Sequence, residues 1–215
     1  MPIRYSKLAD KLRKKTTSQL KKAAKKSAGF FKGLAGKVFK KGVDKSSDAE
    51  LAAMTTHKGI PKIGHIYNFN YPNPKYKTKL PYWDALPLVI PIGYQGKDKF
   101  LGLNLHYISP KLRARLFDAL LSFEAKSSNS EGKVDEARYL KLSYSLLRNM
   151  GSSIYAPTIH SYIYTRIKSD FINIPLESAS ELIMLPTENF KKFTEESGTN
   201  DYNKHLVWDD SARKM

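Results

Sequence analysis

Lysines and aromatic rings are the residues of this sequence whose number and spacing point to a binding chemistry. Between Met1 and Val43 there are fourteen Lys and Arg side chains against one acid, so this segment carries +13 of a formal net charge of +17. Such a segment attracts polyanions, because each cation that neutralises a phosphate releases a condensed counterion. Nine of its lysines are our candidate nucleic-acid contacts: Lys14, Lys15, Lys21, Lys22, Lys25, Lys26, Lys32, Lys40 and Lys41.

A second candidate is the alternating run of rings Tyr67, Phe69 and Tyr71. Alternate residues of a strand lie on one face, so the three rings are expected to point the same way. Exposed rings beside lysines stack the bases of single-stranded nucleic acid, which makes these three candidate stacking residues. The interpretation that we favour is that they fill the core while Asn68 and Asn70 face water.

Catalytic chemistry has little support in the sequence. None of the five histidines forms an H-E-x-x-H pair, and no G-x-S-x-G elbow is present. The stretch GLAGKV has Val38 where a phosphate-binding loop needs Ser or Thr. The absence of cysteine excludes a disulfide framework, a thiolate zinc site and a cysteine nucleophile. We expect a non-catalytic protein with no metal site and no cofactor.

The basic segment at 1–43, called the arm below, has the periodicity of an amphipathic helix. At 100° per residue, the apolar side chains of 20–41 fall on one side and most lysines on the other. Glycines inside it cost about 1 kcal/mol each relative to alanine, so we expect a partner to be needed for order. DNA, a protein groove or a membrane surface would each suit this pattern. The candidate partner-binding residues are Leu20, Phe31, Leu34 and Val38.

The rest of the chain is nearly balanced in charge and predicts one globular domain. We expect a linker at 44–64, a globular α+β domain at 65–192 and a polar C-terminal tail at 193–215. Five predicted strands lie at 66–71, 87–94, 99–108, 171–175 and 181–185. Three predicted helices lie at 111–124, 134–150 and 156–168. Short, largely antiparallel strands with inserted helices predict a small five-stranded barrel of the SH3-like or OB-like kind, preceded by the basic amphipathic arm.

Two local features are given structural interpretations. In the turn PYWDAL, Asp84 can accept hydrogen bonds from backbone amides, which is commoner than a chemical role. On the predicted helix at 111–124, Lys111, Arg113 and Arg115 are interpreted as a solvated face rather than a phosphate site.

The segment at 64–113 resembles part of the structural proteins of T4-like phages with contractile tails. A weaker likeness covers 169–192. The motifs that carry the resemblance are Y-P-N-P-K at 71–75, L-P-Y-W-D at 80–84, P-L-V-I-P-I at 87–92 and F-L-G-L-N-L-H-Y at 100–107. The resemblance implies a component of the neck, tail or baseplate region of the virion, assembled in the host cytoplasm, and it transfers no active-site residue.

We therefore expect a virion structural protein that docks through its globular domain and contacts DNA or neighbouring subunits through the arm. Its partners would be other virion proteins, within an oligomer or a larger assembly, and DNA. One alternative is a dedicated nucleic-acid-binding protein that protects DNA ends or binds single strands. A second alternative, less favoured, is a membrane-active infection factor.

Overall fold

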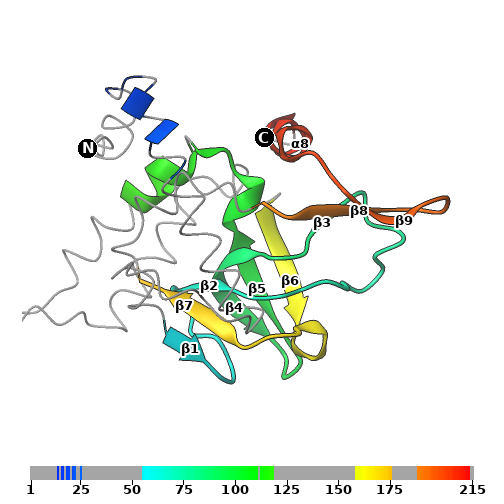
Figure 1. Ribbon diagram of the computed structural model, residues 1–215. Coiled ribbons are helices and arrows are strands. Elements are labelled where there is room, and N and C mark those ends of the chain that lie inside the picture. The colour runs from blue at the N-terminus through cyan, green and yellow to red at the C-terminus, as the bar shows by residue number, and fades with distance from the viewer. Residues whose placement is uncertain are drawn as a thin grey trace, which may run out of the picture.

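The computed structural model describes residues 14, 16, 18, 19, 21, 22, 25, 55–110, 112–118, 158–175 and 188–213. Within these residues the fold is α+β, as predicted, and consists mostly of antiparallel sheet (Figure 1). Residues 110 and 112–118 are helical, and a second helix, α8 (Lys204–Arg213), lies near the C-terminus.

The larger sheet has six strands, and every neighbouring pair is antiparallel. In spatial order its strands are β1 (Thr55–His57), β7 (Phe171–Ile174), β2 (Ile66–Asn68), β4 (Leu88–Gln95), β5 (Lys99–Asn104) and β6 (Ile159–Ile163). The predicted hairpin of β4 and β5 is confirmed, and its turn contains Gly96 at a φ of +68°, which favours glycine. This hairpin forms the central part of the sheet together with β2.

The smaller sheet brings together two distant parts of the chain. Its order is β3 (Trp83–Asp84), β8 (Phe190–Thr194) and β9 (Gly198–Asp201), all antiparallel. The segment predicted as a polar tail, 193–215, therefore contains β9 and α8, and Val207 on α8 is fully buried. The predicted linker at 44–64 likewise contains β1, which pairs with β7.

The predicted barrel is not present among the described residues, because neither sheet closes on itself. The larger sheet has β1 at one edge and β6 at the other, and a barrel needs its two edge strands to pair. The two sheets are joined through the chain between β2 and β4, which contributes β3 to the smaller sheet. The result is two open sheets in place of an SH3-like or OB-like barrel.

The predicted helix at 156–168 is wrong. Residues 159–163 form β6, which pairs with residues 99–103 of β5, and Tyr164–Arg166 form a short 3₁₀ helix, η3. The segment TIHSYIYT at 158–165 is mainly β-branched and aromatic, and such residues favour strands when a free sheet edge is at hand. The helix predicted at 111–124 is confirmed where the structure describes it, with Leu116 and Phe117 buried. The predicted elements at 119–124, 134–150 and 181–185 lie outside the described residues.

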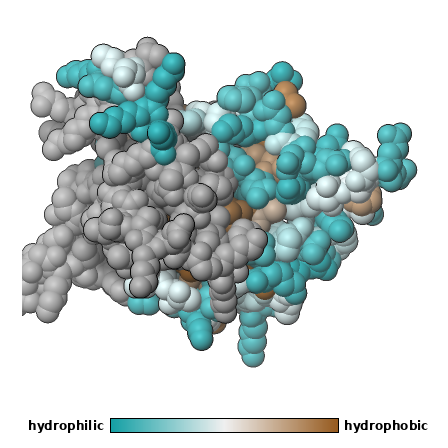
Figure 2. All heavy atoms as spheres, in the orientation of Figure 1, coloured by the Kyte–Doolittle hydropathy of each residue, from teal (hydrophilic) through white to brown (hydrophobic). Residues whose placement is uncertain are grey.

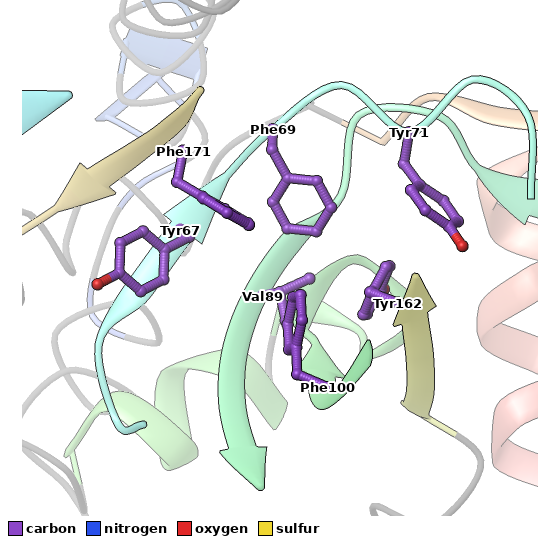
Figure 3. Close-up of a cluster of buried hydrophobic side chains, with 7 residues drawn as sticks. All are labelled: Tyr67, Phe69, Tyr71, Val89, Phe100, Tyr162 and Phe171. Carbon is purple, nitrogen blue, oxygen red and sulfur yellow. The ribbon is translucent and has the colours of Figure 1, made fainter. Parts of the chain in front are cut away.

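The main core cluster consists of six aromatic rings and Val89, which converge from five strands of the larger sheet and from the chain just after β2 (Figure 3). Phe69 is at its centre, with ring centroids 5.1 Å from Phe171 and 5.3 Å from Tyr162 in edge-to-face geometry. Edge-to-face pairs add to the stability that burial alone provides. The cluster contains Tyr67, Phe69, Tyr71, Val89, Phe100, Tyr162 and Phe171.

The asparagine beside these rings does not face water as predicted. Asn68 is fully buried, and its side-chain Nδ2 donates to the backbone oxygens of Leu86 and Pro87 at 3.1 and 3.0 Å. Buried amides of this kind need such partners, because an unpaired polar group in the interior is costly. Asn68 thereby ties β2 to the chain that enters β4.

Candidate nucleic-acid interface

The motifs L-P-Y-W-D and F-L-G-L-N-L-H-Y meet in a buried polar network. Asp84 Oδ2 accepts from Asn104 Nδ2 at 3.0 Å and lies 2.6 Å from His106 Nδ1. Asp84 Oδ1 accepts from the backbone amide of Leu86 at 3.1 Å, so the predicted amide-binding role of Asp84 is confirmed. Asp84, Asn104 and His106 are at most 4% exposed. The network therefore holds β3 against the end of β5.

A second buried pair, Arg113 and Glu188, lies near this network. Arg113 is fully buried, so the interpretation of its side chain as solvated is wrong. Its Nη2 donates to Glu188 Oε1, its Nε donates to Ile108 O at 2.9 Å, and its guanidinium lies 5.8 Å from the ring centroid of Trp208. Burial would raise the pKa of Glu188, but the positive charge of Arg113 and, to a smaller extent, the neighbouring His106 outweigh it and lower that pKa.

Helix α8 is attached to the same network. Trp208 Nε1 donates to the backbone oxygen of His106 at 2.9 Å, and Asp210 Oδ2 accepts from Tyr82 Oη at 2.5 Å. Tyr82 also stacks on Tyr202 with ring centroids 5.0 Å apart. Residues near the C-terminus thus hold the loop that precedes β3.

That loop and the two sheets enclose a pocket of about 540 Å³. Its walls come from the proline-rich stretch at 71–84, the start of β5, Tyr107 and strand β6, and we call it the aromatic pocket. Six aromatic residues line it together with Lys75 and Lys99: Tyr71, Tyr76, Tyr82, Trp83, Tyr107 and Tyr162.

The buried tyrosines that line the aromatic pocket are uncharged. Burial, and then the negative charge of Asp84, raise the pKa of Tyr107 well above its usual value. Burial also raises the pKa of Tyr162, with neighbouring Tyr107 and Asp84 adding to the effect. Both hydroxyls therefore remain protonated through the neutral pH range, and they add no negative charge to the pocket.

The loop on the rim of the aromatic pocket is held in a fixed shape. Tyr76 has a φ of +63°, and its backbone oxygen accepts from the amides of Lys79 and Leu80 at 2.8 and 3.2 Å. Arg166 Nη1 donates to the backbone oxygen of Asn73 at 3.1 Å. Tyr76 is 62% exposed, and Lys75 Nζ lies 4.9 Å from its ring centroid. The loop therefore presents a ring and lysines to solvent.

The predicted stacking residues are in the interior. Tyr67 and Phe69 are 1% and 0% exposed, as the core interpretation expects, and leave no ring face for a base. Tyr71 is 5% exposed, belongs to the same cluster and also lines the aromatic pocket. Tyr71 thus forms part of the wall of the pocket, and Phe69 packs against it from the interior with ring centroids 6.3 Å apart.

Four of the predicted DNA-contacting lysines are among the described residues. Lys14, Lys21, Lys22 and Lys25 are exposed, within a group of mainly hydrophilic side chains (Figure 2). Thr16 and Gln19 make a reciprocal capping box, with the Thr16 amide donating to Gln19 Oε1 at 2.9 Å. Residues 18, 19, 21, 22 and 25 are helical. This cap explains where the predicted basic helix begins.

The remaining candidates of the arm lie outside the described residues. They are the candidate contacts Lys15, Lys26, Lys32, Lys40 and Lys41 and the candidate partner-binding residues Leu20, Phe31, Leu34 and Val38. In the part of the chain that the structure describes, no helix is both long and apolar enough to span a bilayer.

Sequence reasoning missed the aromatic pocket and the His106–Asp84 pair. The sequence did contain two motifs that point to them. L-P-Y-W-D and F-L-G-L-N-L-H-Y include Tyr82, Trp83, Asp84, His106 and Tyr107. Their meeting depends on pairing between β3 and β8, which lie about a hundred residues apart in the chain.

The fold and the site together define an α+β protein with exposed lysines among the described residues near its N-terminus and an aromatic pocket flanked by lysines. The family model described as phage T4 terminal DNA protecting protein matches residues 5–211. The chain therefore belongs to this family and is a protein of a T4-like phage. No curated protein and no solved structure matches the chain.

The family corrects the expected role. The resemblance to T4-like phage proteins is confirmed, but the expectation of a neck, tail or baseplate structural protein is wrong, because the matching family is one of DNA-protecting proteins. Of the alternatives, protection of DNA ends agrees with this family. Membrane activity and docking on other virion proteins gain no support from it.

Proposed function

We propose that this protein binds the ends of phage DNA and shields them from degradation, without catalysis of its own. The observation that carries the proposal is the match of the DNA-protecting family over residues 5–211, which include both the basic helix and the globular part. As a phage protein it acts in the virion or in the infected cell, where linear DNA presents free ends.

The charge distribution supports DNA as the partner. The formal net charge is +17, and the described lysines of the arm are exposed and free to meet phosphates. Electrostatic contacts of this kind give affinity without sequence preference, which suits a protein that must accept any DNA terminus. The arm would hold the duplex while the globular part covers its end.

A protective role by occlusion needs no reactive group. Among the described residues, His106 and Asp84 form a pair with the chemistry of an acid–base catalyst, but they are 0% and 4% exposed and bonded to each other. Its bonds to Asn104 and to the Leu86 amide give it a structural use. These contacts support a binding protein over a hydrolase.

The proposal is tested by digestion of end-labelled linear duplex with an exonuclease, with and without the full-length protein. At a protein concentration about ten times the Kd, only about one end in eleven is free, so we expect the lifetime of the linear DNA to increase about ten-fold. An endonuclease acting on a covalently closed circle of the same sequence is the control. No protection from the exonuclease, or equal protection of the circle, would overturn the proposal.

A further inference from the structure

We propose that the aromatic pocket takes the base of an unpaired nucleotide at a DNA terminus. This inference rests on the proposed function and adds to it the part of the DNA that the globular domain recognises. The observations are the size and lining of the pocket, a buried donor in its wall and the conformation of Tyr76.

The dimensions and walls of the pocket suit one nucleotide. Its volume of about 540 Å³ lies within the range of sites for single small ligands. Most of the lining is aromatic, and base–aromatic stacking is tolerant of sequence because every base has a π-face. The site therefore fits a single splayed base better than a stacked base pair.

Trp83 provides a donor that the described residues leave unused. Its side chain lines the pocket and is 4% exposed, and its Nε1 is buried with no hydrogen-bond partner among the described residues. A buried donor without an acceptor is rare in folded proteins. Base edges carry carbonyl oxygens and ring nitrogens as acceptors, so a base that displaces the groups covering Nε1 would supply the missing partner.

Tyr76 has the features of a stacking residue on the rim. A non-glycine residue at a φ of +63° is strained, and such strain is concentrated at functional sites. The conformation is held by two backbone hydrogen bonds to the Tyr76 carbonyl, from Lys79 and Leu80. It leaves the ring 62% exposed at the mouth of the pocket, where it can cover a base that has entered.

The charges of the lining fit a base inside and phosphates outside. Lys75 and Lys99 line the pocket from two sides, and Lys75 is exposed. Asp98 is the one exposed acid of the lining, and the buried Asp84 is already paired with His106 and Asn104. A nucleotide would therefore place its phosphate against the lysines and its uncharged base among the rings.

The test uses a DNA hairpin, closed by a loop at one end, whose other end is blunt, carries a short unpaired overhang, or carries the same overhang without bases. A dumbbell closed at both ends is the probe without a terminus. Equilibrium binding of the full-length protein to these four probes is measured by fluorescence anisotropy at one salt concentration. A free deoxynucleoside monophosphate is the competitor that separates a terminal nucleotide from a free one.

Three variants accompany the probes. Tyr76→Asn removes the ring and keeps a residue that tolerates the left-handed region, and Tyr76→Phe restores the ring. Ile60→Asn is the matched control, because Ile60 is 61% exposed and is not part of the pocket lining. The thermal unfolding midpoint of Tyr76→Asn should stay close to that of the wild type, which shows that the variant folds.

For the wild type, we expect the overhang with bases to bind about ten-fold more tightly than the overhang without them, the usual effect of one stacked base. Tyr76→Asn should abolish this difference, while Tyr76→Phe and Ile60→Asn should keep it. If the wild type prefers ends over the dumbbell but ignores the bases, the pocket inference is overturned and the proposed function stands. If it shows no preference for ends, both fail. Displacement of the overhang by the monophosphate at equal affinity would overturn the assignment to a DNA terminus.

Discussion

Two groups of aromatic rings in this molecule share Tyr71 and Tyr162 and otherwise have different surroundings. The core cluster around Phe69 is buried, and Phe69 contacts four of its rings edge to face at 5.1 to 6.3 Å. The aromatic pocket combines Tyr76, Tyr82 and Trp83 with lysines, an unused indole donor and open volume. Rings that have neighbours on all sides stabilise the fold, whereas rings with a free face and a polar group nearby are available to a ligand.

The basic side chains show the same contrast between the scaffold and the aromatic pocket. Arg113 is fully buried and neutralised by Glu188, so it belongs to the scaffold. Lys75 and Lys99 line the aromatic pocket, and Lys75 is exposed. The comparison predicts that changes in the first group affect stability, while changes in the second affect binding.

The largest effect on stability is expected from Phe69→Ala. Removal of a fully buried ring loses its burial and leaves a cavity, which costs about 3–5 kcal/mol. Urea unfolding measures this loss, and Phe69→Leu, which keeps most of the volume, should cost less than about 1.5 kcal/mol. Tyr76→Asn should change stability by less than about 0.5 kcal/mol. Equal losses at positions 69 and 76 would remove the distinction between core and pocket.

The next largest effect on stability is expected from Arg113→Met. This change leaves the Glu188 carboxylate buried without its guanidinium partner and should cost about 3–5 kcal/mol at neutral pH. Arg115→Met is the matched control two positions along the same helix, because Arg115 is exposed, and it should be nearly neutral. Unfolding free energies of both variants at neutral pH provide the comparison.

The pH dependence of Arg113→Met sharpens this prediction. In the wild type the pKa of Glu188 is lowered, so its stabilising contribution is present above the unfolded pKa of about 4.3 and is lost as the pH falls through the folded value. In the variant, burial without Arg113 favours the protonated carboxyl. The difference in stability between wild type and variant should therefore shrink as the pH falls below about 5. A difference that stays constant would contradict the role given to this pair.

A smaller loss is expected from Tyr82→Phe, which removes the hydrogen bond to Asp210 that holds α8 to the loop. One partly buried hydrogen bond to a carboxylate contributes about 1–2 kcal/mol. Burial, and then the bond and charge of Asp210, raise the pKa of Tyr82, so wild-type stability should fall as the pH rises above about 10. The Phe variant should show a weaker fall, which alkaline unfolding series can measure.

The smallest effect on stability, close to zero, is expected from the double change Lys75→Ala and Lys99→Ala. Its effect is on DNA, because each lost phosphate contact reduces the slope of log K against log salt by about 0.7–0.9. A salt series of binding to the overhang hairpin measures the slope. Lys58→Ala is the control, because Lys58 is exposed after β1 and is not part of the pocket lining, and it should leave the slope nearly unchanged.

The sequence predicted what depends on local pattern. Alternation and turn residues placed the β4–β5 hairpin, β2 and β7 close to where they lie, and the helix predicted at 111–124 is present at 112–118. Asp84 was placed correctly because its bond to the Leu86 amide is a local turn contact.

What the sequence could not provide depends on distant partners. Residues 159–163 became β6 because the edge of β5 was open to them, and Arg113 was buried because Glu188, 75 residues away, neutralises it. The prediction of a barrel was wrong for the same reason, since strand order is set by pairings between distant parts of the chain. The walls of the aromatic pocket come from separate segments of the chain, so no single sequence motif predicts it.

The most direct test of end binding is the amount of protein bound at saturation to linear duplexes of different length. If the protein recognises ends, the number of molecules bound per duplex stays the same when the length is doubled, and it falls to background when the duplex is circularised. If the amount bound rises in proportion to length, the protein coats DNA through its charge alone, and the central claim is contradicted.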